Sequence, residues 1–205
     1  MLLDVLSYAG IVVFAASGAT VGVRKDFDLW GIVTVGVLTG VGGGILRDVL
    51  LGLTPPASVQ NWQPVLVALV ASLIAFFFHP AFSQLRRTIL VLDAFGMGLF
   101  ATTGAVIALD VHASPFAAAV VGLLTAVGGG ILRDVLANDV PLLLQPADLY
   151  AVPAALGATV VGVCGTYTDV PQGVWLIVGS VLATGLRLAG LTFKWRLPTA
   201  PRRRR

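Results

Sequence analysis

Two nearly identical stretches of this sequence, GVGGGILRDVLLG and AVGGGILRDVLAN, combine a glycine triplet with an arginine–aspartate pair inside an apolar run. Their shared residues are Gly42, Gly43, Gly44, Arg47 and Asp48 in the first stretch and Gly128, Gly129, Gly130, Arg133 and Asp134 in the second. Each glycine costs a helix about 1 kcal/mol relative to alanine. Charges inside a membrane-spanning segment mark ion or substrate pathways and have a partner nearby. These residues therefore favour the passage of a charged or dipolar solute.

The overall composition indicates an integral membrane protein. Of the 205 residues, 57% are hydrophobic and only 11% are charged, whereas a soluble domain carries about 25% charged residues. The sequence shows no nucleophile–base set and no nucleotide-binding glycine loop, so we expect neither an enzyme nor a cofactor. The single Cys164 and the widely separated His79 and His112 lack metal-ligand spacing, and we expect no metal site.

The apolar runs predict an all-α membrane protein with seven transmembrane helices. A helix needs about 20 mostly apolar residues to cross the hydrocarbon, and the loops between the runs contain proline. The predicted helices are residues 4–22, 30–51, 63–79, 89–109, 114–137, 149–166 and 173–193.

The basic residues predict the orientation of these helices. Ten of the thirteen lie in loops on one side: Arg24, Lys25, Arg86, Arg87, Lys194, Arg196 and Arg202 to Arg205. The positive-inside rule places that side in the cytoplasm and the N-terminus outside. We therefore expect a multi-pass protein of the cell (inner) membrane, whose basic tail at 194–205 contacts anionic lipid rather than nucleic acid.

The chain also repeats itself with an offset of 86 residues. FAASGA at 14–19 corresponds to FATTGA at 100–105, and 11 of the 14 positions from 39 to 52 match those from 125 to 138. This predicts a first three-helix repeat at 1–86, a second at 87–172 and an additional seventh helix at 173–193. Because three is odd, the second repeat is inverted in the membrane, and such repeats form a transport pathway at their interface. A duplicated bundle without a pathway is the alternative.

The glycine triplets allow two interpretations. The fourfold spacing of Gly36, Gly40 and Gly44 lets helices approach closely, but it does not require Gly42 or Gly43. Three consecutive glycines favour a kink or a short unwound segment in the second and fifth helices. We therefore expect a hinge at both triplets.

Depth in the membrane predicts which buried charges form pairs. Arg47 lies about six residues, or roughly 10 Å, beyond the middle of its helix, and the inverted Arg133 lies a similar distance on the cytoplasmic side. Asp93 shares the depth of Arg133, which predicts an Asp93–Arg133 pair. The repeat counterpart of Asp93 is Ser7, which cannot neutralise Arg47.

The remaining expectations concern Arg47 and Arg187. Adjacent helix residues do not face each other, so we do not expect Asp48 to neutralise Arg47. The Arg47 end of the pathway is then the more positive one, and Arg47 is the expected gate. For Arg187, near the end of the last helix, we expect a side chain that extends to the lipid head groups.

Seven predicted helices, two three-helix repeats and GGGILRD on the second and fifth helices resemble the trimeric intracellular cation channel family, prokaryotic branch. This sequence class is also labelled a bacterial glycine-transporter domain family. The resemblance covers about residues 4–193. It implies a homotrimer with one pathway per protomer, lined by the first, second, fourth and fifth helices, that passes K⁺ and, less selectively, Na⁺.

Two transport functions remain open from the sequence. A passive K⁺-permeable channel is the first hypothesis, and a secondary transporter of a small zwitterion such as glycine is the second. An interrupted helix offers amide groups to a carboxylate and carbonyl groups to an ammonium or a cation, so it does not choose between them. A membrane scaffold without transport is a third possibility.

Overall fold

A computed structural model describes residues 1–78, 85–145 and 149–195 of the chain. The long helices in the described residues are α1 (Leu2–Arg24), α2 (Leu29–Leu50), α4 (Trp62–Phe78), α5 (Leu85–Asp110), α6 (Pro115–Leu136), α7 (Ala151–Tyr167) and α8 (Gln172–Phe193). Each coincides with one of the predicted membrane segments to within a few residues. The short helix α3 (Ala57–Gln60) and the 3₁₀ turn η2 (Leu142–Leu144) were not predicted.

Five of these helices are long and apolar enough to cross a membrane: α1, α2, α5, α6 and α8. The helices α4 and α7 are equally apolar but have only 17 residues each. The molecule is thus an all-helical, multi-pass membrane protein.

Local sequence determines where α2 and α6 begin. Asp28 caps α2 by accepting a hydrogen bond from the backbone N–H of Gly31 at 2.8 Å. Ser114 caps α6 in the same way through Ala117 at 3.2 Å, and Pro115 occupies the first helical turn. Such caps satisfy backbone donors that have no partner within the helix. The two glycine-rich helices therefore start at defined positions relative to the rest of the bundle.

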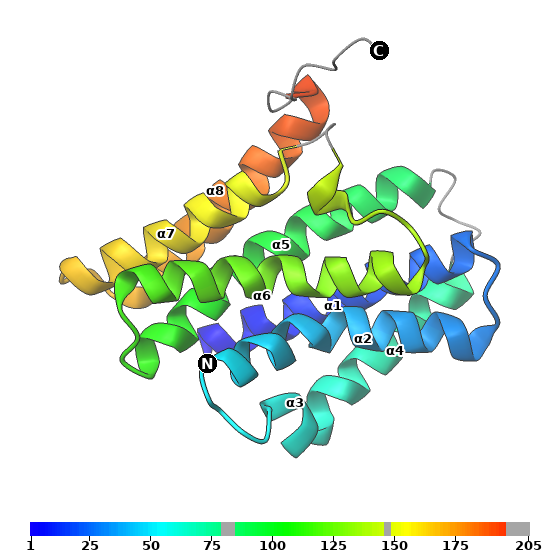
Figure 1. Cartoon of the computed structure of the whole chain (residues 1–205), viewed down its shortest axis with the longest axis horizontal. Helices are drawn as coiled ribbons and strands as arrows, with labels where there is room; N and C mark the ends of the chain where they lie inside the picture. Colours follow the sequence, from blue (N-terminus) through cyan, green and yellow to red (C-terminus); the bar gives the residue numbers. More distant parts are fainter. Residues whose placement is uncertain (79–84, 146–148, 196–205) are drawn as a thin grey trace, which may run out of the picture.

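The helices pack in two equivalent groups of three (Figure 1). In the first group α1, α2 and α4 contact one another, and in the second α5, α6 and α7 do the same. The groups meet along α1–α5 and α2–α6, whereas α8 packs on α5 and α7. The helices that carry the repeated motifs, α2 and α6, therefore cross at the interface between the two groups.

Candidate functional site

The glycine triplets lie where α2 and α6 cross. A Cβ atom on Gly43 would lie 2.3 Å from the carbonyl oxygen of Thr125, and one on Gly129 would lie 2.4 Å from the carbonyl oxygen of Thr39. Thr125 and Thr39 are themselves repeat counterparts, so each helix places its middle glycine against the same carbonyl of the other. Only glycine allows this backbone separation.

At the first and third triplet positions, the distance to the nearest neighbouring atom differs between the two repeats. A Cβ atom on Gly42 would lie 2.3 Å from Leu132, and one on Gly128 would lie 3.1 Å from Leu46. The third glycines are not equivalent. At Gly44 the nearest atom is Nη2 of Arg47 at 3.9 Å, whereas Gly130 faces the hydroxyl of Tyr150 at 2.6 Å and Asp93 Oδ1 at 3.3 Å, and these distances are again measured from a Cβ atom built on the glycine.

The predicted kink at the triplets is not confirmed. The α-helical assignment runs without interruption from Leu29 to Leu50 and from Pro115 to Leu136. Close approach of two backbones therefore accounts for Gly43 and Gly129 in this conformation. The alternative of small residues at a helix contact describes the structure better than an unwound segment does.

Two repeat-related phenylalanines fill the middle of the bundle beside this crossing. Phe14 and Phe100 are buried, and their ring centroids lie 5.1 Å apart. Each ring packs against a glycine of the opposite repeat. A Cβ atom on Gly10 would lie 2.4 Å from Phe100, and one on Gly96 would lie 2.9 Å from Phe14. The centre of the molecule is thus closed by aromatic rings and by the glycine contacts.

At one end of the crossing, Arg47 and Asp48 line a cavity of about 160 Å³, here called the first-repeat cavity. Its other lining residues include Asp4, Ser7, Gly40, Gly44, Ala57 and Phe100. Arg47 donates from Nε to Asp48 Oδ1 at 2.8 Å, and Asp48 Oδ2 accepts the backbone N–H of Ala57 at 2.8 Å. Asp48 therefore attaches the segment after α2 to the end of that helix.

This contact corrects the expectation that Asp48 does not neutralise Arg47. Adjacent helix residues point in different directions at Cβ, but the long arginine side chain folds back onto its neighbour, and Nη2 of Arg47 also lies 2.7 Å from Asp48 Oδ1. Ser7 lines the cavity without contributing a charge, as predicted.

At the other end of the crossing, Arg133 is fully buried among polar partners. Its Nη1 donates to Asp93 Oδ1 at 2.7 Å and to Ser17 Oγ at 2.8 Å, and its Nε donates to Asp134 Oδ1 at 2.8 Å. The predicted Asp93–Arg133 pair is therefore confirmed. Asp134 Oδ2 accepts the backbone N–H of Leu142 at 2.8 Å, as Asp48 does with Ala57.

A second hollow opens next to Asp134, with a volume of about 770 Å³, and is called the second-repeat hollow. Its rim carries Arg24, Lys25, Arg86 and Asp139. Asp139 forms ion pairs with Arg24 and with Lys25, the latter at 2.6 Å. These pairs connect the end of α1 to the segment after α6. The repeat counterparts of Arg24 and Asp139 are Asp110 and Leu53. Because leucine carries no charge, the Arg24–Asp139 ion pair has no equivalent at these two positions.

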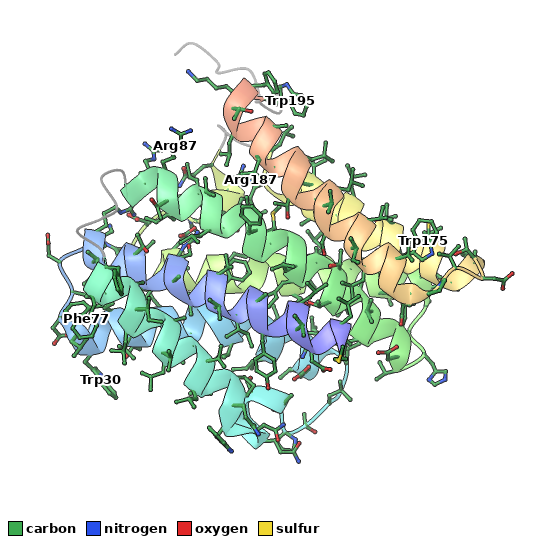
Figure 2. The ribbon with its side chains drawn as sticks, turned by 180° about the vertical axis from the view of Figure 1, so that it is seen from behind. Trp30, Phe77, Arg87, Trp175, Arg187 and Trp195 are labelled. Atoms are coloured by element: carbon green, nitrogen blue, oxygen red, sulfur yellow. The ribbon has the colours of Figure 1, made fainter. Side chains whose placement is uncertain are left out.

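The expectation that the Arg187 side chain extends to the lipid head groups is wrong. Arg187 is fully buried between α8 and α5 (Figure 2), its guanidinium lies 4.9 Å from the ring centroid of Tyr150, and Nη1 donates to the carbonyl oxygen of Leu149 at 3.2 Å. The Tyr150 hydroxyl in turn donates to Asp93 Oδ1 at 3.1 Å. A cation over an aromatic face compensates part of the cost of burial, which explains the inward orientation.

Three site residues were not identified from the sequence: Ser17, Asp139 and Tyr150. The repeated FAASGA and FATTGA stretches could have indicated Ser17, because they place a hydroxyl at equivalent positions. The sequence gives no such signal for Tyr150 or Asp139, because the corresponding position in the other repeat holds a different type of residue in both cases.

Comparisons with known proteins agree with this architecture. The family model described as "Glycine transporter" matches twice, at residues 4–80 and 90–166. A membrane protein of Deinococcus radiodurans is 44% identical over 75% of this chain and 72% of its own length, and the inner membrane protein YadS of Escherichia coli K12 is 34% identical over 97% and 96%.

The structural comparison points to one group of proteins. The crystal structure of the TRIC trimeric intracellular cation channel orthologue from Rhodobacter sphaeroides superimposes with a TM-score of 0.89 at 38% identity, covering 93% of this chain and 97% of that one. The double family match, the relative that matches over nearly its full length and this superposition agree. The chain belongs to the prokaryotic branch of the trimeric intracellular cation channel family, whose sequence model is described as a glycine transporter.

Proposed function

We propose that this protein is a K⁺-permeable monovalent cation channel that assembles as a homotrimer with one pathway through each protomer. The observation that carries the proposal is a pair of hollows at opposite ends of one α2–α6 crossing, the first lined by Arg47 and Asp48 and the second by Asp134 of the same repeated motif. The similar Rhodobacter sphaeroides protein is a trimeric intracellular cation channel orthologue, which supports cation permeation and a trimer.

The pathway that we propose lies within a single chain. It enters the first-repeat cavity beside Arg47, passes Phe14 and Phe100 at the glycine crossing, continues past Arg133 and leaves through the second-repeat hollow. The rings and the close glycine contacts close it in the middle. On this proposal the closed centre makes the structure a non-conducting state, and conduction requires α2 and α6 to move apart.

The charges along this route are compatible with a cation. Arg47 is paired one to one with Asp48, whereas Arg133 has two carboxylate neighbours, Asp93 and Asp134. An excess of one carboxylate attracts a cation in a low-dielectric surrounding, and rings of acidic groups serve cation channels in this way. Of the two motif arginines, Arg47 has fewer carboxylate partners, so Arg47 remains the candidate for gating.

Aromatic residues at both ends of the helices support the proposed count of seven spans. Exposed rings occur at Trp30, Phe77 and Phe193 at one end and at Trp62, Phe116 and Tyr167 at the other. Figure 2 places Trp30, Phe77 and Arg87 at the same end of the bundle and Trp175 at the opposite end. Aromatic residues favour the two membrane interfaces. We therefore infer that α4 and α7 also span the membrane, which gives seven spans with the N-terminus outside.

The glycine hinge stays a prediction for the conducting state. Gly44 has free space on its accessible side, so the third triplet position of α2 is not explained by packing. We propose that α2 bends there when the pathway opens, since helices bend most easily at glycine pairs.

A secondary transporter of a small zwitterion such as glycine is the second candidate. The description of the family model favours it, and two hollows separated by a closed centre also suit alternating access. The rates of the two mechanisms differ greatly, which allows a direct test.

Planar-bilayer recording of the purified protein in a K⁺ gradient decides between these functions. A channel gives discrete unitary currents in the picoampere range, with a reversal potential close to that of K⁺. A carrier gives no unitary currents but exchanges radiolabelled glycine across proteoliposome membranes. Glycine counterflow without unitary currents would overturn the channel proposal.

A further inference from the structure

The two ends of the proposed pathway are not equally open. The first-repeat cavity reaches inward to Ser7, Gly44, Arg47 and Phe100. Among the described residues, the second-repeat hollow is lined by Asp134 but by none of the repeat counterparts of Ser7, Gly44 and Arg47, which are Asp93, Gly130 and Arg133. At the second end, a side chain therefore occupies the space that corresponds to the cavity at the first end.

The side chain in that space is Tyr150. A Cβ atom on Gly130 would lie 2.6 Å from the Tyr150 hydroxyl, whereas the equivalent atom on Gly44 would have its nearest neighbour at 3.9 Å. Tyr150 is 2% exposed, and its hydroxyl donates to Asp93 Oδ1. The phenol thus lies between Asp93 on α5 and Gly130 on α6, directly beside the Arg133 cluster.

The helix α8 holds this phenol from the other side. Arg187 of α8 lies over the Tyr150 ring, and it donates a hydrogen bond to the carbonyl oxygen of the preceding Leu149. The helix α8 follows the two repeats and has no counterpart within them. The restraint on the second end therefore has no equivalent at the first end.

We propose that Tyr150 is the side chain that closes the second-repeat end of the pathway, and that Arg187 positions it. This inference rests on the proposed function. When the ring withdraws from Gly130, water and a hydrated monovalent cation gain access to Asp93 and Arg133, as they have to Ser7 and Arg47 at the first end. Rotation of one ring, together with the start of α7, is a small change that opens a continuous route to the centre.

Graded substitution of Tyr150 tests the proposal in planar bilayers. Tyr150→Phe keeps the ring but removes the hydroxyl that donates to Asp93, so we expect only a small increase in open probability. Tyr150→Leu and Tyr150→Ala shorten the side chain, and we expect the open probability to increase severalfold from Phe to Ala. Tyr167→Ala is the matched control, because Tyr167 lies at the other end of α7 and is 75% exposed. A purely structural role predicts lower stability without larger currents.

A second measurement does not depend on ion flow. In a Cys164→Ala background, Ser17→Cys places a thiol next to Arg133, and its reaction rate with a small cationic thiosulfonate reports access to this cluster. We expect the rate to rise severalfold when Tyr150→Ala or Arg187→Gln is added. If Tyr150→Ala does not fold, Arg187→Gln provides the same test, because it removes the residue that positions the Tyr150 ring.

The two measurements separate the two proposals. A wild-type protein without unitary currents would contradict the channel function, whereas the thiol measurement would still decide whether Tyr150 closes this end. A conducting wild type whose currents and thiol reactivity are unchanged by Tyr150→Ala, or by Arg187→Gln, would overturn the role of Tyr150 alone.

Discussion

Asp93 on α5 and Arg133 on α6 form a 2.7 Å ion pair in which neither side chain is exposed. Removing one partner of a buried pair leaves an uncompensated charge, which costs about 3–5 kcal/mol in soluble proteins. Because Asp93 also accepts the Tyr150 hydroxyl, this pair joins α5, α6 and the start of α7. It is the most heavily connected contact of the site.

The Asp93–Arg133 pair can be tested by a double-mutant cycle. Asp93→Asn should lower the thermal stability and the yield of folded protein in detergent, because Arg133 then keeps only Asp134 as a charged partner. Adding Arg133→Ala should restore part of the loss. A double variant that is no more stable than Asp93→Asn would argue against coupling between the two residues.

The role of the triplets can be tested with two neighbouring glycines. Gly43→Ala should strongly destabilise the protein, because the new methyl group would collide with the Thr125 carbonyl oxygen at 2.3 Å. Gly44→Ala should fold normally, since the nearest atom is 3.9 Å away. Thermal unfolding in detergent measures both effects.

The same Gly44→Ala variant separates the hinge from the packing role. A hinge in α2 predicts a lower open probability in a protein of normal stability, because alanine favours the straight helix by about 1 kcal/mol. If the currents of Gly44→Ala equal those of the wild type, the hinge proposal fails and close approach alone explains the first triplet.

Arg47→Ala should leave folding nearly intact and make opening easier or less voltage-dependent. The reason is that Arg47 lines a cavity and, in the part of the chain that the structure describes, is bonded to its neighbour Asp48 alone, whereas Arg133 is enclosed. One charge moved through the full membrane potential is worth about 2.3 kcal/mol per 100 mV. Single-channel recording over a range of voltages is the measurement, and Arg47→Lys is the control that keeps the charge. Unaltered gating in Arg47→Ala would remove Arg47 as the gate.

Asp139→Asn should reduce K⁺ conductance at low ionic strength with little change in stability. Asp139 offsets part of the positive charge of Arg24 and Lys25 at the rim of the second-repeat hollow, and partly exposed pairs contribute only about 0–1 kcal/mol. Without its carboxylate the rim repels cations more strongly, but salt screens this repulsion over about 10 Å at 0.1 M. The difference from the wild type should therefore disappear in high salt. A deficit that persists there would indicate a structural effect instead.

Tag accessibility tests the orientation. An N-terminal tag should react with a membrane-impermeant reagent in intact cells, and a C-terminal tag should react only after permeabilisation. The physical reason is the concentration of basic residues on one side of the bundle. A C-terminal tag that is labelled in intact cells would reverse the proposed orientation, which would also exchange the outer and cytoplasmic ends of the pathway.

The membrane location, the seven long helices, the repeat and the Asp93–Arg133 pair could all be predicted from the amino-acid sequence. These are one-dimensional signals: the length of an apolar run, a constant offset of 86 residues, and the depth that helix rise assigns to each charge. Depth alone was sufficient for Asp93 and Arg133 because α5 and α6 are consecutive, directly packed helices, so residues of equal depth on them lie side by side.

Only the tertiary structure decided how the glycines and the other charges are used. Gly43 meets the Thr125 carbonyl oxygen because two helices cross there, and a single helix carries no record of its crossing partner. Arg47 reaches Asp48 by a side-chain conformation that helix geometry does not specify. Arg187 turns inward because the start of α7 presents the Tyr150 ring to it. Tyr150 itself became recognisable only where α5, α6, α7 and α8 converge, since the space that it fills belongs to no single segment of the chain.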